Sequence, residues 1–198
     1  ANIRRWTRGV DTELFRPGLE PALDLPKPVF LYVGRVAVEK NIEAFLALDL
    51  PGTKLVVGDG PRLAELKRRF PEVTFAGAQH GEALARHYAA ADVFVFPSLT
   101  DTFGLVLLEA LAAGVPVAAY PVAGPLDVIG DHPVGVLDHD LRKAALAALK
   151  IDPATCRAFA EANDWETSVQ QFLDNLDPFN PAEAFVSTAI AATGEAAE

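Results

Sequence analysis

Residues 93–114 read VFVFPSLTDTFGLVLLEALAAG, and this stretch decides the fold class. It opens with four apolar residues that favour a strand, breaks at Pro97, and resumes after Gly104 with apolar residues at helical spacing. The first run is continuous rather than alternating, which is typical of a strand buried on both faces of a parallel sheet. The stretch therefore predicts a buried strand, a polar loop and an apolar helix in succession.

The same alternation extends through most of the chain. Further strands are predicted at 28–33, 54–57, 73–75, 115–119 and 134–137. Helices are predicted at 41–48, 61–69, 82–91, 104–113, 141–149, 156–163 and 165–173. Strands that alternate with helices are typical of a parallel sheet. We therefore expect an α/β fold, a Rossmann-like parallel sheet of about six strands with helices on both faces.

The chain divides into three parts. Residues 1–26 are punctuated by glycine and proline and lie outside the alternation, so we expect an extended lead-in there. Residues 27–175 form the predicted domain. Residues 176–198 combine prolines with an Ala/Glu-rich stretch of low complexity, and we expect a tail that is a marginal helix or disordered. A chain of 198 residues is long enough for one globular domain.

Composition argues against several classes of protein. The chain has 17 Lys and Arg residues against 27 Asp and Glu, a net charge of −10, which disfavours binding to nucleic acid. Cys156 is the single cysteine, so neither a disulfide framework nor a four-cysteine zinc site is available. No apolar run approaches the ~20 residues of a membrane span, and the first residues do not resemble a signal peptide. We expect a cytoplasmic protein and, since methionine is missing, a longer natural chain.

Two cations follow the first predicted strand. In an open parallel sheet the ligand crevice lies at the carboxyl ends of the strands. Gly34 permits a sharp exit from the strand, and Arg35 and Lys40 follow before the next helix. In so acidic a chain, two cations at this edge indicate an anionic ligand. The alternative is an exposed pair that balances Glu39 and Glu43.

Two further loops contain small residues at the same edge. Gly58 and Gly60 bring backbone amides close to a bound group, although the loop alone is also consistent with an ordinary turn. Residues 77–79, Gly-Ala-Gln, would let a flat ring lie against the backbone, and His80 is best interpreted as a polar loop residue.

The loop after 93–96 contains the most specific pattern. If a helix starts near Phe103 or Gly104, its free amides favour a phosphate, and Asp101 lies just before that anion site. Glu109 follows five residues after Gly104, roughly 7–8 Å further along the helix axis. The two acids could therefore reach hydroxyls on either side of the phosphate. Apolar neighbours make Glu109 costly to bury without a partner. The alternative is a helix cap and one surface glutamate.

Several spaced motifs resemble those of a known family. They are, in order, Gly34-Arg35 with Glu39-Lys40-Asn41, Gly58-Asp59-Gly60-Pro61, Phe75-Ala76-Gly77, ADVFVFPS at 91–98, Asp101-Thr102-Phe103-Gly104-Leu105 with Glu109-Ala110, and Gly114-Val115-Pro116-Val117. Across about residues 7–175 the chain resembles the carboxyl-terminal half of retaining nucleotide-sugar glycosyltransferases with the GT-B fold. Among these it most resembles GDP-mannose-dependent α-mannosyltransferases, with UDP-sugar enzymes next.

The resemblance implies a role for each matching residue. Arg35 and Lys40 match the cations that hold the donor diphosphate, and Glu109 matches the carboxylate that holds the ribose. Asp101 matches the first acid of the family's Glu-x7-Glu pair, which holds the transferred sugar. Aspartate is one methylene shorter than glutamate, which leaves the sugar's identity open. Arg35, Lys40 and Asp101 are thus the implied catalytic residues. The implied donor-binding residues are Gly34, Arg35, Lys40, Gly58, Gly77, Ala78, Gln79, Asp101, Phe103, Gly104, Leu105, Val106 and Glu109.

The resemblance also implies a reaction. We expect the donor-binding half of an enzyme that transfers a hexose, mannose before glucose, from a nucleoside diphosphate sugar to an acceptor with retention. The acceptor, a lipid or glycan, would bind an amino-terminal domain that is missing here, and any peripheral membrane contact would belong to that half. Alone, the chain should bind nucleotide without measurable transfer. The alternatives are a non-catalytic nucleotide-binding scaffold and a nucleotide-sugar epimerase of the same architecture.

Two further expectations concern metals and the last helices. We expect no cofactor and no metal, because protein cations can neutralise the diphosphate. The acids and histidines between 131 and 140 are interpreted as solvated loop and helix-start residues rather than ligands. The helices around Trp165 and Phe172 would pack toward the missing half or, alternatively, cover this domain's own sheet.

Overall fold

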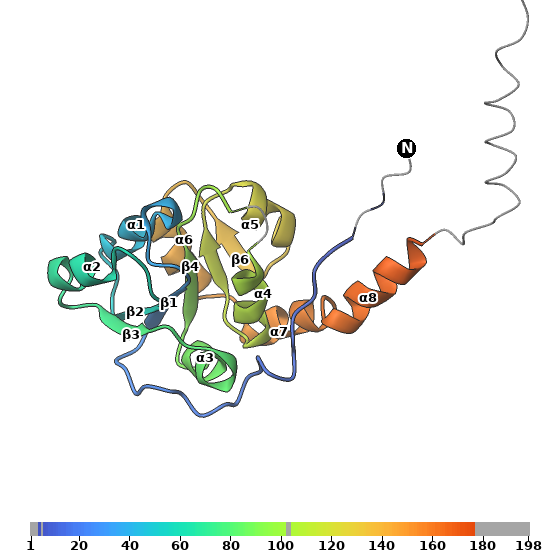
Figure 1. The fold of residues 1–198 in the computed structure, drawn as a ribbon, viewed down its shortest axis with the longest axis horizontal. Helices are drawn as coiled ribbons and strands as arrows, with labels where there is room; N and C mark the ends of the chain where they lie inside the picture. The colour runs from blue at the N-terminus through green and yellow to red at the C-terminus, as the bar shows by residue number, and fades with distance from the viewer. Residues whose placement is uncertain (1–3, 5, 102–103, 177–198) are drawn as a thin grey trace, which may run out of the picture.

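A six-stranded parallel sheet forms the centre of the protein (Figure 1). The structure is a computed structural model that describes residues 4, 6–101 and 104–176. The strand order is β3-β2-β1-β4-β5-β6, and every neighbouring pair is parallel. The strands are β1 (Val29–Val33), β2 (Thr53–Val57), β3 (Thr74–Gly77), β4 (Val93–Phe96), β5 (Val117–Ala119) and β6 (Gly135–Leu137). All six predicted strands are confirmed.

Helices cover both faces of the sheet, as expected. One face packs against α1 (Ile42–Leu46), α2 (Leu63–Arg69) and α6 (Leu141–Ala148). The other face packs against α3 (Gly81–Tyr88), α4 (Leu105–Ala112) and α7 (Pro153–Glu161), together with the lead-in. A short 3-10 helix, η1 (Val38–Lys40), precedes α1. The fold class predicted from the sequence is therefore confirmed.

Alternate residues of a strand supply the two apolar layers. In β1, Val29, Leu31 and Val33 join the cluster with α3, α4 and α7, whereas Phe30 and Tyr32 join the cluster on the opposite face. Continuous burial on both faces explains the unbroken apolar runs of β1, β4 and β5. The edge strands β3 and β6 are only partly buried, so the expectation of full burial is wrong for them. An edge strand has a neighbour on one side only.

The order of the strands reverses between β1 and β4. From β1 the chain builds outward through β2 to β3, and it then returns to the other side of β1 to add β4, β5 and β6. The loop after β1 leads to α1 on one face, and the loop after β4 leads to α4 on the other. Open α/β sheets bind their ligands at such a reversal, in a crevice outside the carboxyl ends of the strands, so the loops after β1 and β4 are where the candidate site is expected.

Helix α5 (Ala123–Val128) is absent from the sequence-based prediction. Its sequence, AGPLDV, contains a Gly-Pro pair that is typical of a loop. Pro125 is the third residue of the helix, where the backbone has no intrahelical acceptor for an N–H in any case, so proline costs little. A proline in the first turn therefore explains both the helix and the missed prediction.

The lead-in contributes buried side chains and hydrogen bonds to the domain. Val10 and Phe15 are buried, and the Val10 amide donates to the Asn163 carbonyl at 3.2 Å. The Arg157 guanidinium in α7 donates to the carbonyls of Thr12 and Phe15, each at 2.9 Å. The same nitrogen reaches a carbonyl at the end of α4, 3.0 Å away. One side chain thus connects the lead-in, α4 and α7.

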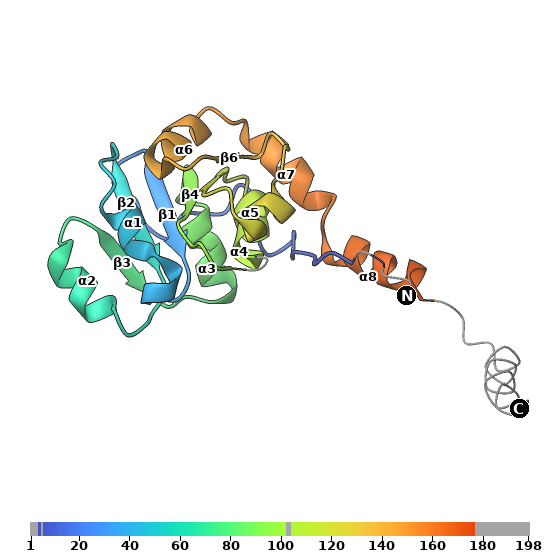
Figure 2. The same ribbon diagram turned by 90° about the horizontal axis from the view of Figure 1, so that it is seen from above.

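Helix α8 (Trp165–Asp174) projects away from the sheet (Figures 1 and 2). It contacts the lead-in, where the Trp6 indole donates to the Ser168 carbonyl at 3.0 Å and the Thr7 hydroxyl to Gln171 at 2.8 Å. The expectation that the last helix covers the domain's own sheet is therefore wrong, because α8 packs on the lead-in. Packing toward a missing half remains a prediction, and the tail 177–198 lies outside the described residues.

Membrane insertion finds no support in the described helices. None of them, within residues 4, 6–101 and 104–176, is long and apolar enough to cross a bilayer.

Replacing Arg157 with leucine should destabilise the fold. The change removes the donor from three backbone carbonyls that are partly buried, and we expect the free energy of unfolding to fall by about 2–3 kcal/mol. Urea denaturation measures the loss. Arg68→Leu, at an exposed position of α2, is the matched control and should change stability by less than ~0.5 kcal/mol. Equal losses in the two variants would contradict this role of Arg157.

Candidate active site

The loops after β1 and β4 meet across the crevice. The Lys40 ammonium forms an ion pair with the Asp101 carboxylate, and the Asn41 amide nitrogen donates to the Pro97 carbonyl at 3.0 Å. Lys40 and Asn41 follow β1, whereas Pro97 and Asp101 follow β4. The tertiary structure therefore brings together a cation and an acid that are 61 residues apart in the chain.

Asn41 has a backbone conformation that aids this contact. Its φ of 51° lies in the left-handed region, which few residues other than glycine and asparagine adopt readily. The residue closes η1 and begins α1, so it turns the chain sharply between the two. This turn places Lys40 at the mouth of the crevice while the Asn41 side chain reaches across to the β4 loop.

The glycines after β1 and β2 allow two backbones to touch. A Cβ atom on Gly58 would lie 1.9 Å from the Gly34 carbonyl oxygen, and one on Gly60 would lie 2.4 Å from the Val36 carbonyl oxygen. The Gly34 amide donates to Val57 O at 3.0 Å. These loops therefore have no room for larger side chains, and their backbone lines the edge of the sheet.

Arg35 forms the surface pair that the alternative interpretation predicted. Its guanidinium lies 3.3 Å from a Glu39 carboxylate oxygen, and the side chains are 65% and 52% exposed. Exposed ion pairs contribute little stability, so an anionic ligand can displace Glu39. The alternative is wrong for Lys40, which pairs with Asp101, and for Glu43, which pairs with arginines just before and at the end of α2. Among the described residues, no ion pair joins Arg35 to Asp101 or to Glu109.

Helix α4 begins where the sequence analysis expected. Gly104 precedes its first residue with a φ of 77°, and none of the described side chains caps the helix. The first turn of a helix leaves amides without intrahelical acceptors and carries a partial positive charge. The amides of Leu105 and Val106 belong to that turn. Phe103 lies outside the described residues.

Glu109 is held on the inner side of α4. The Tyr88 hydroxyl donates to its Oε2 at 2.9 Å. Burial raises the pKa of the Glu109 carboxyl, and the hydrogen bond from Tyr88 lowers that pKa in part. The alternative of Asp101 as a helix cap and Glu109 as a surface residue is therefore wrong, because Asp101 pairs with Lys40 without capping α4 and Glu109 is largely shielded.

A small cavity of about 90 Å³ adjoins Glu109. The lead-in forms one wall with Gly9, Val10 and Asp11, and Trp165 at the start of α8 forms another. Sequence reasoning identified Glu109 as a candidate residue. It did not predict which residues surround it, because the walls of this cavity come from segments far away in the chain. Tyr88 was likewise missed, since it reads as one apolar position of an amphipathic helix.

The loop after β3 lies beside the loop after β2. The Gly58 amide donates to the Gly77 carbonyl at 2.8 Å. The Gln79 side chain folds back and donates to the Ala76 carbonyl at 3.0 Å, and Ala78 lies between them in the chain. The Gln79 amide is thus turned back onto its own loop, and the contact of a flat ring with the backbone of residues 77–79 remains a prediction.

Three of the acids and histidines between 131 and 140 make structural contacts in the described chain. Asp140 caps α6 by accepting from the Lys143 amide at 3.0 Å, and Asp138 pairs with the Lys143 ammonium. The His132 ring lies 4.9 Å from the Phe159 ring. No group of three or more possible ligands that could hold a metal ion is found among the described residues.

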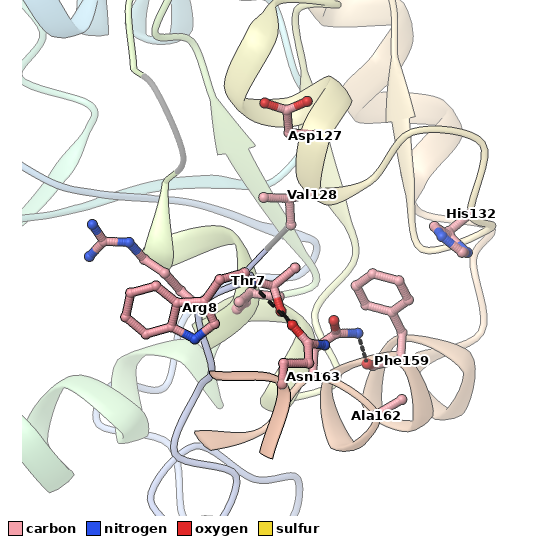
Figure 3. Close-up of a pocket in the computed structure, with 11 residues that line it drawn as sticks. Thr7, Arg8, Asp127, Val128, His132, Phe159, Ala162 and Asn163 are labelled. Carbon is pink, nitrogen blue, oxygen red and sulfur yellow. Dashed lines mark hydrogen bonds between the residues drawn. The ribbon is translucent and has the colours of Figure 1, made fainter. Parts of the chain in front are cut away.

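A wider cavity of about 750 Å³ lies beside α4 (Figure 3). It is lined by Leu108 of α4 and by the lead-in, α5, the loop after α5 and the α7–α8 region, as Arg8, Asp127, His132 and Asn163 illustrate. None of the predicted donor-binding residues is among its lining residues. Size alone therefore does not identify the candidate site in this protein.

A doubly wound parallel sheet, with charged residues in the loops after β1 and β4 and a helix that begins directly after the second loop, defines a Rossmann-like α/β domain, here of the GT-B type. A family model described as Glycosyl transferases group 1 matches residues 27–152. The chain belongs to this family of glycosyltransferases.

Two relatives illustrate the similarity in sequence. A GDP-mannose-dependent alpha-mannosyltransferase of Mycobacterium tuberculosis is 38% identical over 156 residues, which are 72% of this chain and 41% of that protein. A sulfoquinovosyl transferase of Arabidopsis thaliana is 37% identical over 146 residues, which are 67% of this chain and 29% of that protein. The chain thus spans less than half the length of either relative.

Two solved structures illustrate the similarity in fold. Sucrose-phosphate synthase from Thermosynechococcus elongatus matches with a TM-score of 0.71 at 28% identity, over 96% of this chain and 53% of that one. Anabaena HepE in complex with UDP matches with a TM-score of 0.67 at 19% identity, over 85% and 56%. The GT-B fold expected from the resemblance is therefore confirmed.

Replacing Glu109 with glutamine should stabilise the free chain at neutral pH. Because burial raises the folded-state pKa of Glu109, the native protein loses stability as pH rises from the unfolded pKa to the folded one. Glutamine avoids the charge and keeps an acceptor for Tyr88, so the melting temperature should rise by about 1–3 °C at pH 7.5.

Calorimetry at two pH values tests this account. At pH 4, where burial keeps the wild-type carboxyl largely neutral, the two proteins should melt within about 1 °C of each other. A Glu109→Gln variant that is less stable than the wild type at pH 7.5 would contradict the conclusion that burial of this carboxylate destabilises the native protein.

Proposed function

We propose that this chain is the donor-binding domain of a glycosyltransferase that transfers a hexose from a nucleoside diphosphate sugar to an acceptor with retention. The contact of Lys40 with Asp101 across the reversal of strand order is the observation on which the proposal chiefly rests. It joins a group suited to phosphate with a group suited to sugar hydroxyls beside the uncapped start of α4.

Lys40 and Arg35 would hold the diphosphate. Transfer of the sugar breaks the bond to the distal phosphate, so negative charge grows on the departing nucleoside diphosphate. Fixed cations and helix-terminal amides stabilise such charge where it develops. Lys40 gives up its contact with Asp101, and Arg35 its exposed contact with Glu39, when a phosphate binds.

The two acids would hold hydroxyl groups. Asp101, once Lys40 turns to phosphate, can accept from hydroxyls of the transferred sugar. Glu109 lies further along α4 and can accept from the ribose in the same way. Gly34 and Gly58, together with residues 77–79, would then present backbone to the nucleotide, and the turn before α4 would contact the sugar and the distal phosphate. No metal is required where two protein cations neutralise the diphosphate.

Mannose is the favoured sugar and glucose the next. Support for mannose comes from the M. tuberculosis relative, whose name specifies GDP-mannose, whereas the A. thaliana relative is named for sulfoquinovosyl transfer. The acceptor, a lipid or glycan, and any membrane contact would belong to a part of the protein outside this chain. Retention follows from the family resemblance.

Removing either charged side chain, Lys40 or Glu109, should weaken nucleotide binding. We expect the chain to bind GDP or UDP, and Lys40→Ala or Glu109→Ala to weaken binding by roughly 10-fold to 100-fold, because each removes a charge-assisted contact. Isothermal titration calorimetry measures the affinities. Arg68→Ala, at an exposed position of α2, is the control and should bind like the wild type.

Two outcomes would contradict the proposal. One is a wild-type chain that binds neither nucleotide. The other is binding that both crevice variants retain, which would place the nucleotide elsewhere.

A further inference from the structure

A buried tyrosine hydroxyl points at the carboxylate of Glu109. Tyr88 is 0% exposed, and its hydroxyl lies 2.9 Å from Glu109 Oε2 and 3.4 Å from the Val106 carbonyl oxygen. A hydroxyl has one proton to donate, and the shorter contact to a charged acceptor is the stronger one. The Tyr88 proton is therefore directed chiefly at Glu109.

The Tyr88 ring is fixed from two sides. The Phe15 ring of the lead-in meets it edge-on, with centroids 5.6 Å apart and planes at 88°. The Phe94 ring of β4 lies 5.9 Å away on a tilted plane. Because the interior is packed, the hydroxyl cannot move without displacing these rings. The lead-in and the sheet thus determine where the hydroxyl stands.

The other charged and titratable groups near Glu109 are few. Asp11 of the lead-in lines the same small cavity, but its Oδ1 accepts from the amides of Glu13 and Leu14 at 3.0 and 2.8 Å. The remaining lining residues of that cavity are uncharged. Within the described chain, Tyr88 is the one side chain that donates a hydrogen bond to this carboxylate, and it does so at Oε2, which leaves Oε1 for a ligand.

We propose that Tyr88 is a positioning residue, which holds one oxygen of Glu109 so that the carboxylate meets the ribose hydroxyls of a bound nucleotide in a fixed orientation. The inference rests on the proposed function, since it needs a nucleotide in the crevice. Tyr88 itself does not touch the ligand. It acts through Glu109, and its hydroxyl supplies the hydrogen bond that lets this carboxylate remain ionised inside apolar surroundings.

The electrostatics of the pair agree with this role. Burial raises the pKa of Tyr88, so the hydroxyl stays protonated and donates throughout the neutral range. The hydrogen bond from Tyr88 lowers the pKa of Glu109 against the effect of burial. Without the hydroxyl, the pKa of Glu109 should rise further. As the pH falls, the carboxylate would then become protonated, and stop accepting from the ribose, at a higher pH than in the wild type.

Tyr88→Phe tests the proposal on the chain as it stands. Whichever of GDP and UDP the wild type binds is titrated by calorimetry beside its 2′,3′-dideoxy analogue, from pH 5 to pH 8. The variant should bind the ribose nucleotide about fivefold to twentyfold more weakly and the dideoxy analogue unchanged. The pH below which affinity for the ribose nucleotide declines should also move upward. Tyr120→Phe, which removes a hydroxyl with no hydrogen bond in the described chain, is the matched control and should leave both affinities unchanged.

The outcomes separate this inference from the proposed function. Equal losses for the two nucleotides would mean that Tyr88 serves packing alone and would overturn the inference, as would unchanged binding in Tyr88→Phe. A wild-type chain that binds no nucleotide would overturn both proposals. If Tyr88→Phe does not fold, NMR of the wild type decides. A Tyr88 hydroxyl proton still bonded to Glu109 at nucleotide saturation supports the inference, and one that leaves Glu109 on binding overturns it.

Discussion

The reversal of strand order between β1 and β4 is the constraint on which the rest of the structure depends. Because the connections from these two strands leave toward opposite faces, their loops end side by side with no helix between them. Lys40 and Asp101 occupy that space and neutralise each other. Under the proposed function, a nucleotide sugar would replace this pairing, with a phosphate for the lysine and hydroxyls for the aspartate.

Glu109 shows that a charged residue at the candidate site costs the free chain stability. A carboxylate in apolar surroundings is unfavourable, and the raised pKa of Glu109 reflects this. The protein offsets part of the cost with the Tyr88 hydroxyl, which Phe15 of the lead-in helps to hold. The lead-in and the start of α8 also enclose the cavity beside Glu109. The lead-in and α8, at the two ends of the domain, therefore both influence the surroundings of Glu109. The lead-in is thus part of the candidate site.

Much of the fold could be predicted because its signals are local. The unbroken apolar runs of β1 and β4 and the helical spacing of α4 each lie within a few residues, and the structure contains all three elements. Helix α5 was missed because Gly124-Pro125 has the local signal of a loop, although a proline in the first turn is compatible with a helix. Helix α8 was predicted as a helix, but nothing in its sequence specified that it would pack on the lead-in rather than on the sheet.

The sequence by itself determined the α/β class, the strands and most helices, and the residue types at the candidate site, because periodicity and loop chemistry are properties of short segments. Only the tertiary structure decided that Lys40 faces Asp101 and that the Tyr88 hydroxyl donates to Glu109. Those pairings depend on the order of strands and on packing between helices, which join residues far apart in the chain. Spacing along a sequence contains no information about such neighbours.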